Sequence, residues 1–172
     1  MIPCEYFWRD LGISPEEVSR RGLRVFPEAA ALTVVHGPGR DFQMTPETAA
    51  AWRRLRTASA RDGVGITLVS AFRSYAYQAE LIRKKLALGK RLEDVLTVLA
   101  PPGCSEHHTG AALDLGTPGC PPADESFEQT AAFDWLKRAA HSHGFSMSYP
   151  RDNHQGYIYE PWHWRFEGRL IG

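Results

Sequence analysis

The side chains best suited to chemistry lie in two short segments that are far apart in the chain. The first is the run 105–114, with the sequence SEHHTGAALD, and the second is 160–163, with the sequence EPWH. A zinc ion in a hydrolase takes three ligands from imidazole and carboxylate groups and keeps its fourth tetrahedral position for a water molecule. His107, Asp114 and His163 would supply that set. The two segments therefore predict a zinc site.

The spacing of these residues predicts the elements that hold them. Gly110 lies between the first histidine and the aspartate, and residues 111–115 have the pattern of a buried strand entered through a turn. Pro161 directly follows Glu160, which argues against the helix of an HExxH metalloprotease. We therefore expect a loop that carries Glu160 as a base and runs into a strand at 162–166. A single ligated carboxylate would leave the metal cluster cationic, which lowers the pKa of a bound water toward roughly 7.

Taken together, these motifs resemble a known family. The pattern S-x-H-x-x-G-x-A-x-D, followed by E-P-W-H-x-R, resembles the D-alanyl-D-alanine carboxypeptidase family of zinc peptidases, whose VanY-like enzymes trim the stem peptides of bacterial peptidoglycan. A third block, SAFRSYAYQ at 70–78, is similar to the family's S-x-x-R-S-x-x-x-Q and lies upstream in the expected order. The three blocks span residues 70–165, a little over half of the chain.

The resemblance implies a role for each matched residue. It makes Glu160 the catalytic base and gives zinc three ligands, which are His107, Asp114 and His163. It makes Arg73 a cation that stabilises the substrate or the oxyanion, since a guanidinium group grips a carboxylate bidentately. Ser105 and Gln78 fall where the family contacts the terminal carboxylate of the substrate. The implied reaction is hydrolysis of the terminal D-alanine bond of peptidoglycan stem peptides, muropeptides or their precursors.

Two functions from other classes stay open at this point. A peptidoglycan endopeptidase of the phage-lysin type shares this kind of zinc site but cuts within the stem or the cross-bridge. A noncatalytic zinc-containing binding module would lack the base, and Glu160 is present. Among carboxypeptidases, the sequence does not decide between D,D-, L,D- and dipeptidase specificity, because pocket depth and loop closure set that choice.

The composition predicts a compact folded enzyme. The chain has 172 residues, of which 43% are hydrophobic and 11% aromatic, as is ordinary for globular proteins. Lysine plus arginine equals aspartate plus glutamate at 20 each, so the formal net charge of zero gives no sign of a nucleic-acid partner. No stretch approaches the roughly 18 apolar residues of a membrane span. The sequence does not predict an oligomeric state.

The compartment also stays open. The first residues, MIPCEY, lack the basic and then apolar pattern of a signal peptide. The protein would be cytoplasmic if it acts on precursors or recycled fragments, and it would reach the wall if phage-type lysis delivers it. It would be periplasmic or at the cell wall if the sequence is a trimmed form.

Two cysteines lie on either side of the first motif. Cys104 and Cys120 would form a disulfide in an oxidising compartment, but we favour free thiols because no signal peptide is visible. The Pro- and Gly-rich segment 116–123 follows the aspartate ligand and is expected to be a loop at the cleft mouth. One hypothesis is that this loop gates substrate entry.

The expected fold class is α+β, with helices packed around an antiparallel sheet that carries the zinc site. We expect one domain at 1–172, in which residues 1–40 are an N-terminal extension packed on it and 66–166 are the catalytic core. Capping signals, helical periodicity and stop glycines predict helices at 14–22, 45–63, 75–88, 91–99 and 127–143. Strands are expected at 66–72, 111–115, 145–149, 156–160 and 162–166.

Other aromatic side chains near the motifs are expected to be structural. His108 is expected to be a loop residue, and Trp162 and Trp164 are expected to pack in the core or the cleft wall. His154, shortly before the predicted base, is the one further histidine that we consider for the cleft.

Overall fold

The computed structural model describes residues 3–168, and within this range six α-helices surround two antiparallel sheets. The α-helices are α1 (Cys4–Leu11), α2 (Pro15–Arg20), α3 (Pro46–Arg61), α4 (Tyr75–Ala87), α5 (Leu92–Leu96) and α6 (Ala131–Ala139). The strands are β1 (Thr33–Gly37), β2 (Arg40–Met44), β3 (Thr67–Ser70), β4 (Ala112–Gly116), β5 (Phe145–Met147) and β6 (His163–Phe166). Three short 3₁₀-helices are η1 (Glu106–Thr109), η2 (Glu125–Gln129) and η3 (Ala140–His143). The predicted domain bounds, 1–172, extend beyond the described residues at both ends.

Side-chain caps fix the starts of three helices that the sequence predicts. The hydroxyls of Ser14, Thr45 and Ser74 accept hydrogen bonds from the backbone N–H three residues on, at the starts of α2, α3 and α4. Such a cap satisfies one of the N–H groups that the first turn of a helix leaves without a partner. The predicted helices that begin near 14, 45 and 75 are therefore confirmed.

The larger sheet has the strand order β3-β4-β6-β5, and every neighbouring pair is antiparallel. Strand β4, one of its two inner strands, is buried along its whole length, and all of its residues except Asp114 are apolar or glycine. β1 and β2 form a separate hairpin, which a hydrogen bond from Phe72 N to Gln43 O (2.9 Å) joins to the end of β3. The predicted α+β class with an antiparallel sheet is confirmed.

One predicted strand is wrong. Residues 156–160 form no strand, because their backbone makes single hydrogen bonds to loop partners instead of a ladder. Ile158 N donates to Thr97 O at 3.0 Å, and Glu160 N donates to Tyr149 O at 3.1 Å. The segment is a loop held between two other loops.

Other elements differ in extent from the prediction. The helix expected at 127–143 is divided into η2, α6 and η3, because Thr130 has an extended backbone (φ −100°, ψ 153°) and caps α6. The strand expected at 66–72 is reduced to β3, whose pairing with β4 shifts register between Leu68 and Ser70. The helix expected at 91–99 is reduced to α5. α1 and the β1–β2 hairpin lie before residue 45, where the sequence predicts only one helix.

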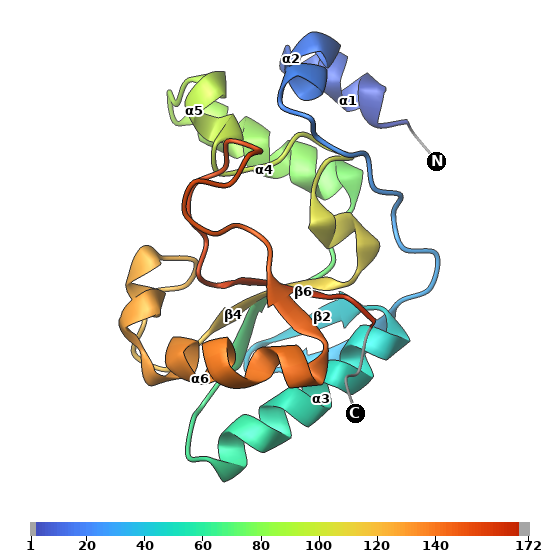
Figure 1. The fold of residues 1–172 in the computed structure, drawn as a ribbon. Coiled ribbons are helices and arrows are strands. Elements are labelled where there is room, and N and C mark those ends of the chain that lie inside the picture. The colour runs from blue at the N-terminus through green and yellow to red at the C-terminus, as the bar shows by residue number, and fades with distance from the viewer. Residues whose placement is uncertain (1–2, 169–172) are drawn as a thin grey trace.

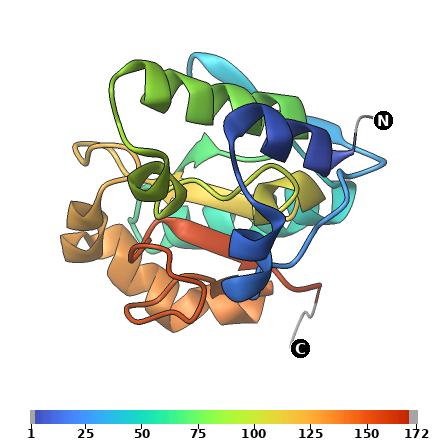
Figure 2. The ribbon, with the colours of Figure 1, turned by 90° about the horizontal axis from the view of Figure 1, so that it is seen from above.

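Two hydrophobic clusters divide the interior. One lies among α3, α6 and the larger sheet and includes Trp52, Leu113 and Trp135. The other joins α1, α2, α4 and α5 and includes Trp8 and Ile82. Figure 1 shows the helices of the second cluster together above the sheets, with α3 and α6 below them, and Figure 2 shows α1 alongside α4. The sheet that carries the motifs therefore lies between two groups of helices.

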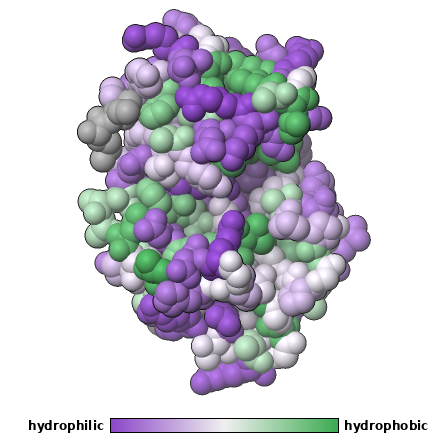
Figure 3. All heavy atoms as spheres, turned by 180° about the vertical axis from the view of Figure 1, so that it is seen from behind, coloured by the Kyte–Doolittle hydropathy of each residue, from purple (hydrophilic) through white to green (hydrophobic). Residues whose placement is uncertain are grey.

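None of the helices within residues 3–168 combines the length and the apolar character that crossing a membrane requires. The longest, α3, has 16 residues and contains four arginines. On the face shown in Figure 3, hydrophobic residues form separate groups among hydrophilic ones.

Candidate metal centre and active-site cleft

Three predicted ligands converge on one point. His107, Asp114 and His163 are buried, and one ligand atom from each lies within 4.8 Å of the others. Asp114 in β4 and His163 in β6 are register partners on neighbouring strands. His107 lies in η1, and Gly110 ends this 3₁₀-helix in the left-handed conformation (φ 65°), which favours glycine. The spacing of the first motif thus combines one 3₁₀ turn, a glycine and the entry to β4.

Each imidazole presents one nitrogen to Asp114 and anchors the other. Nε2 of His107 lies 3.2 Å from Oδ1 of Asp114, and Nδ1 of His163 lies 3.1 Å from the same oxygen. On the far sides of the rings, Nδ1 of His107 lies 2.6 Å from Ala71 O, and Nε2 of His163 lies 3.0 Å from Oε2 of Glu106. Atoms that bind one tetrahedral zinc at about 2.0–2.1 Å lie roughly 3.3 Å apart, and zinc-binding imidazoles use their other nitrogen in this way. The donor set therefore fits zinc.

Arg73 reaches the site from the loop between β3 and α4. Its Nη2 donates to Oδ2 of Asp114 at 2.6 Å, and its Nε donates to Ser70 Oγ at 3.1 Å. Its Nη1 donates to Gln78 Oε1 at 3.5 Å. The guanidinium group therefore lies at the site. Its contact with the predicted metal ligand Asp114 is additional to the expected role of stabilising the substrate or the oxyanion.

Glu160 lies beside the centre, with Oε2 at 3.8 Å from Nδ1 of His163. Burial raises the pKa of Glu160 to about 7, with Asp114 adding to the rise and His163 and Arg73 opposing it. A carboxylate whose pKa lies near neutrality can both accept and return a proton at physiological pH. Position and pKa therefore suit the predicted base.

The ligands also shift one another's titration. Burial lowers the pKa of His107 to about 4, and the charge of Arg73 adds to this effect. Burial by itself would lower the pKa of His163, but hydrogen bonds to Asp114 and Glu106 raise it to about 10. Burial by itself would raise the pKa of Asp114, but His107 and Arg73 hold it well below its usual range. In the metal-free protein Asp114 is therefore ionised and His163 protonated, and His163 would have to release a proton to serve as a metal ligand.

Comparison with known proteins assigns the chain to a family. Residues 41–169 match the family model of VanY, described as D-alanyl-D-alanine carboxypeptidase. The match covers about three quarters of the 172 residues. The chain belongs to the VanY family.

Individual relatives agree with this assignment. This VanY-family chain is 34% identical over 137 residues to VanXYC of Enterococcus gallinarum, a bifunctional D-Ala-D-Ala dipeptidase and D-Ala-D-Ala carboxypeptidase, with 74% of the chain and 69% of the relative covered. It is 32% identical over 126 residues to YodJ of Bacillus subtilis (strain 168), with 72% of the chain covered. It spans only about half of YodJ, at 46% of that protein's length.

Solved structures share the fold. The LdcB LD-carboxypeptidase superposes with a TM-score of 0.66 at 29% identity, over 81% of this chain and 64% of that one. VanYB, solved in complex with D-alanine-D-alanine, superposes with a TM-score of 0.67 at 24% identity, over 84% of this chain and 83% of that one. The second likeness bears on the fold alone.

A cavity of about 340 Å³ opens beside the metal centre of this VanY-family protein. All seven residues that the sequence predicts for the site line it, namely Arg73, Gln78, Ser105, His107, Asp114, Glu160 and His163. Pro122 and Ala123 line it as well, so the segment 116–123 borders the cleft as expected. The structure therefore gathers every predicted site residue around one cavity, while their individual roles stay predictions.

The two residues expected to contact substrate already have protein partners. Gln78 is fully buried; its Nε2 donates to Ala100 O at 2.9 Å, and its Oε1 accepts from Arg73. Ser105 Oγ accepts from His107 N at 3.4 Å and so caps η1. Gln78 therefore also positions Arg73, and Ser105 also stabilises the start of η1.

Glu106 is a residue of the site that sequence reasoning missed. Besides its contact with His163, it accepts hydrogen bonds from Ser148 Oγ (2.6 Å) and Arg165 Nη1 (3.1 Å). Burial by itself would raise the pKa of Glu106, but these partners lower it to about 2, with His163 contributing most. The available signal was an acidic residue directly before the ligand in Ser105-Glu106-His107.

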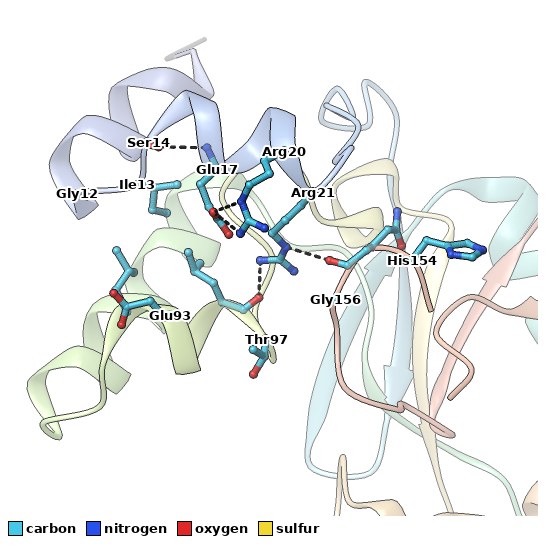
Figure 4. Close-up of a pocket in the computed structure, with 13 residues that line it drawn as sticks. Gly12, Ile13, Ser14, Glu17, Arg20, Arg21, Glu93, Thr97, His154 and Gly156 are labelled. Carbon is cyan, nitrogen blue, oxygen red and sulfur yellow. Dashed lines mark hydrogen bonds and ion pairs between the residues drawn. The ribbon is translucent and has the colours of Figure 1, made fainter. Parts of the chain in front are cut away.

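Two histidines outside the ligand set differ from expectation. His108 is a core residue rather than a loop residue: it is fully buried, its Nδ1 lies 2.6 Å from Arg73 O, and its Nε2 accepts from Gly103 N. His154 does not line the cleft and instead lies at a separate cavity near α2 and α5 (Figure 4). Trp162 and Trp164 are buried in the core as expected, and Trp162 also borders the cleft.

The cysteines are free thiols. Cys104 is buried in the cluster of α1 and α4, where burial raises its pKa to about 12. Cys120 packs against the other cluster, with its Sγ at 3.7 Å from Ser126 Oγ. The structure therefore contains the free thiols that we favoured over a disulfide between Cys104 and Cys120.

Proposed function

We propose that this protein is a zinc-dependent carboxypeptidase that removes the terminal D-alanine from peptidoglycan stem peptides or their precursors. One observation carries the proposal. His107, Asp114 and His163 converge with the geometry of a zinc site, and Glu160 lines the same cavity with a pKa raised to about 7. Three protein ligands and a nearby base are what zinc-assisted hydrolysis requires.

In the proposed mechanism, a bound zinc ion supplies Lewis acidity that activates water for attack on the scissile carbonyl. Glu160 accepts the proton of the attacking water and passes it to the leaving amine nitrogen, which becomes the amino group of D-alanine. Arg73 places a positive charge at the cleft, where it steadies negative charge on the substrate or the intermediate. Glu160 is itself buried, so solvent screens its charge only weakly.

The substrate class follows from the family. The family model is described as D-alanyl-D-alanine carboxypeptidase, and VanXYC is named for cleavage of D-Ala-D-Ala substrates. LdcB is named as an LD-carboxypeptidase that recognises peptidoglycan. These names support a stem peptide as substrate and leave two candidate bonds, one in pentapeptide and one in tetrapeptide stems.

The test is to incubate zinc-loaded protein with soluble muropeptides that carry pentapeptide or tetrapeptide stems and to identify the products by mass spectrometry. We expect loss of one D-alanine from at least one stem. The Glu160→Gln variant, which keeps the shape of the base but cannot accept the proton, is expected to leave both stems intact.

The same experiment separates the competing functions. Cleavage of intact cell walls within the stem or cross-bridge, with both soluble stems untouched, would favour an endopeptidase. Binding of muropeptides without any cleavage would favour a binding module, and either result would overturn the proposal.

A further inference from the structure

The N-terminal part of the chain, which the family match does not include, contacts two segments that continue into the wall of the cleft. The match begins at residue 41, whereas α2 and the residue that follows it, Arg21, lie well before that point. Arg21 is at the C-terminal end of α2 with a helical backbone (φ −80°, ψ −3°), so its side chain is presented by a defined element. Figure 4 shows this side chain extending from α2 toward the segment that contains His154 and Gly156.

Arg21 joins two parts of the chain that are far apart in sequence. Its Nε donates to the backbone carbonyl of Gln155 at 2.9 Å, and its Nη1 donates to the backbone carbonyl of Leu96 at 3.0 Å. Its guanidinium carbon lies 4.7 Å from the centre of the Tyr157 ring. Hydrogen bonds from a charged donor and a cation–π contact are among the stronger polar interactions in proteins. One side chain therefore fixes the end of α5 against the loop around Tyr157.

Both of the segments that Arg21 joins continue into the wall of the cleft. Residues 98–100, which follow α5 after Thr97, line the same cavity as the metal centre, and so do Tyr157 and Ile158. The two segments are also joined by the hydrogen bond from Ile158 N to Thr97 O. A shift at the Arg21 joint would therefore move this part of the cleft wall.

Aromatic contacts continue from this joint to a predicted metal ligand. The ring of Tyr157 packs edge-on against Tyr149, with ring centres 5.0 Å apart. Tyr149 in turn packs on His163, with ring centres 4.7 Å apart. Unlike the wall, however, His163 is held independently by strand pairing in β6 and by Asp114 and Glu106. Loss of Arg21 should therefore disturb the wall much more than the metal centre.

The contacts of Arg21 fix the position of the segments that it joins but are not those that would give the highest stability. In the described part of the chain, Nη2 of Arg21 and the hydroxyl of Tyr157 are buried without a hydrogen-bond partner. Buried polar atoms that lack partners reduce stability, and an apolar contact of the same shape would avoid that cost. The planar guanidinium group, however, can stack on a ring and donate in two directions at once, which a lysine cannot reproduce.

We infer that Arg21 is a positioning residue, which holds the cleft wall formed by residues 98–100 and 157–158 in the shape that binds substrate. The inference rests on the proposed function for the identity of the substrate, but the positioning itself can be tested without turnover. It assigns to the N-terminal segment a part in substrate binding.

The test compares Arg21→Ala and Arg21→Lys with the matched control Arg20→Ala. Arg20 is the preceding residue, is exposed, and pairs only with Glu17 within α2 among the described residues (Figure 4). For each zinc-loaded variant we would measure amide hydrogen exchange in 154–158, zinc affinity by competition with a chromophoric chelator, thermal unfolding, and kcat and KM on the cleaved stem peptide.

We expect faster exchange at 154–158 in both Arg21 variants, with zinc affinity unchanged within about twofold. Because a misplaced wall weakens binding rather than chemistry, kcat/KM should fall by about ten- to a hundredfold, mainly through a higher KM. Arg20→Ala should match the wild type in every measurement. Because Arg21→Lys keeps the charge and the aliphatic part of the side chain, it tests the inference even if Arg21→Ala fails to fold.

Two results would overturn the inference. The first is that amide hydrogen exchange at 154–158 in both Arg21 variants is as slow as in the wild type. The second is that kcat and zinc affinity fall by the same factor by which KM rises, which would indicate a general loss of structure. If the wild type cleaves neither stem, the proposed function fails, whereas exchange at 154–158 still decides whether Arg21 positions the wall.

Discussion

Arg73 Nη2 lies 2.6 Å from Oδ2 of Asp114, whereas both histidine ligands contact the other oxygen, Oδ1. The two oxygens of one carboxylate thus face different partners, a cation on one side and the metal position on the other. The side chains of Arg73 and Asp114 are only 14% and 5% exposed, so solvent screens their attraction weakly. This contact makes Arg73 a support of the metal centre in addition to its proposed role toward substrate.

We expect Arg73→Ala to lower the stability of the metal-free protein by about 3–5 kcal/mol, because it removes the guanidinium partner of the buried Asp114 carboxylate. Zinc, which supplies a compensating positive charge, should recover part of this loss. Thermal unfolding with and without zinc measures both effects. Arg83→Ala is the control, since its partner Asp10 is half exposed, and such pairs contribute about 0–1 kcal/mol. Equal losses in the two variants would contradict the role given to Arg73.

Two substitutions should separate chemistry from metal binding. We expect Glu160→Gln to reduce kcat by at least about 10²-fold with zinc retained, because only the proton acceptor is lost. His163→Ala should lose zinc as well as activity, because it removes one of the three ligands. Metal content by mass spectrometry and single-turnover assays measure these outcomes. Full activity in either variant would exclude the assignment of that residue.

The pKa of Glu160 predicts a pH-dependent difference in stability. The pKa of Glu160 is raised from 4.5 to about 7 in the folded metal-free protein. Well below pH 4.5, its carboxyl group is protonated in both the folded and the unfolded protein, so it does not change the stability there. As pH rises from about 4.5 through 7, its ionisation favours the unfolded state. Glu160→Gln should therefore gain stability over the wild type between pH 5 and pH 8, by up to roughly 3 kcal/mol. Denaturant unfolding of the metal-free proteins at both pH values measures this gain, and a constant difference would refute it.

Glu106 should set the affinity for zinc. Its carboxylate accepts from Nε2 of His163, and loss of such outer partners typically weakens metal binding by 10–100-fold. We expect a loss on the order of tenfold or more for Glu106→Gln, measured by chelator competition. Glu128→Gln, at an exposed pair with Arg151, should leave the affinity unchanged. Wild-type affinity in Glu106→Gln would show that the ring of His163 needs no carboxylate partner.

Gly110 tests the local geometry of the first motif. A Cβ at this position would lie 3.0 Å from Leu32 Cδ2 and 3.2 Å from the backbone N of Thr45, and the backbone has φ +65°. We expect Gly110→Ala to cost about 2–4 kcal/mol, from the left-handed backbone and the crowding together. Gly119→Ala, with φ +84° and open space around it, should show only the backbone cost of about 1–2 kcal/mol. Thermal unfolding of the pair checks the prediction, which fails if both variants lose the same stability.

The sequence predicted which side chains converge at the site more fully than it predicted the elements around them. Zinc chemistry needs particular residue types, so the type and spacing of His107, Asp114 and His163 predicted a group of side chains that the fold does bring together. Capped helices such as α3 were predictable because Thr45 and Pro46 mark the first turn in the sequence itself. Residue types, spacing and helix caps are properties of short segments, so they can be recognised in a single sequence.

The errors concern interactions between distant residues. Residues 156–160 have apolar character, but their partners at 97 and 149 belong to loops, so no ladder forms. Glu106 looks like an ordinary loop acid until Ser148, His163 and Arg165 surround it. His108 adjoins a ligand, yet only the fold shows that it bonds Arg73 and Gly103 instead. Such partners lie 5 to 61 residues away, beyond the reach of a periodic pattern.

The pairing of β4 with β6 sets Asp114 directly opposite His163. Since successive side chains of a strand point to opposite faces, a slip of one residue would turn one of these ligands away from the other. Zinc affinity therefore reports on strand register, and only a correctly paired sheet can hold the ion tightly. During folding, the metal would bind tightly only after β4 and β6 have paired in the native register. Its binding would then stabilise that register relative to shifted ones.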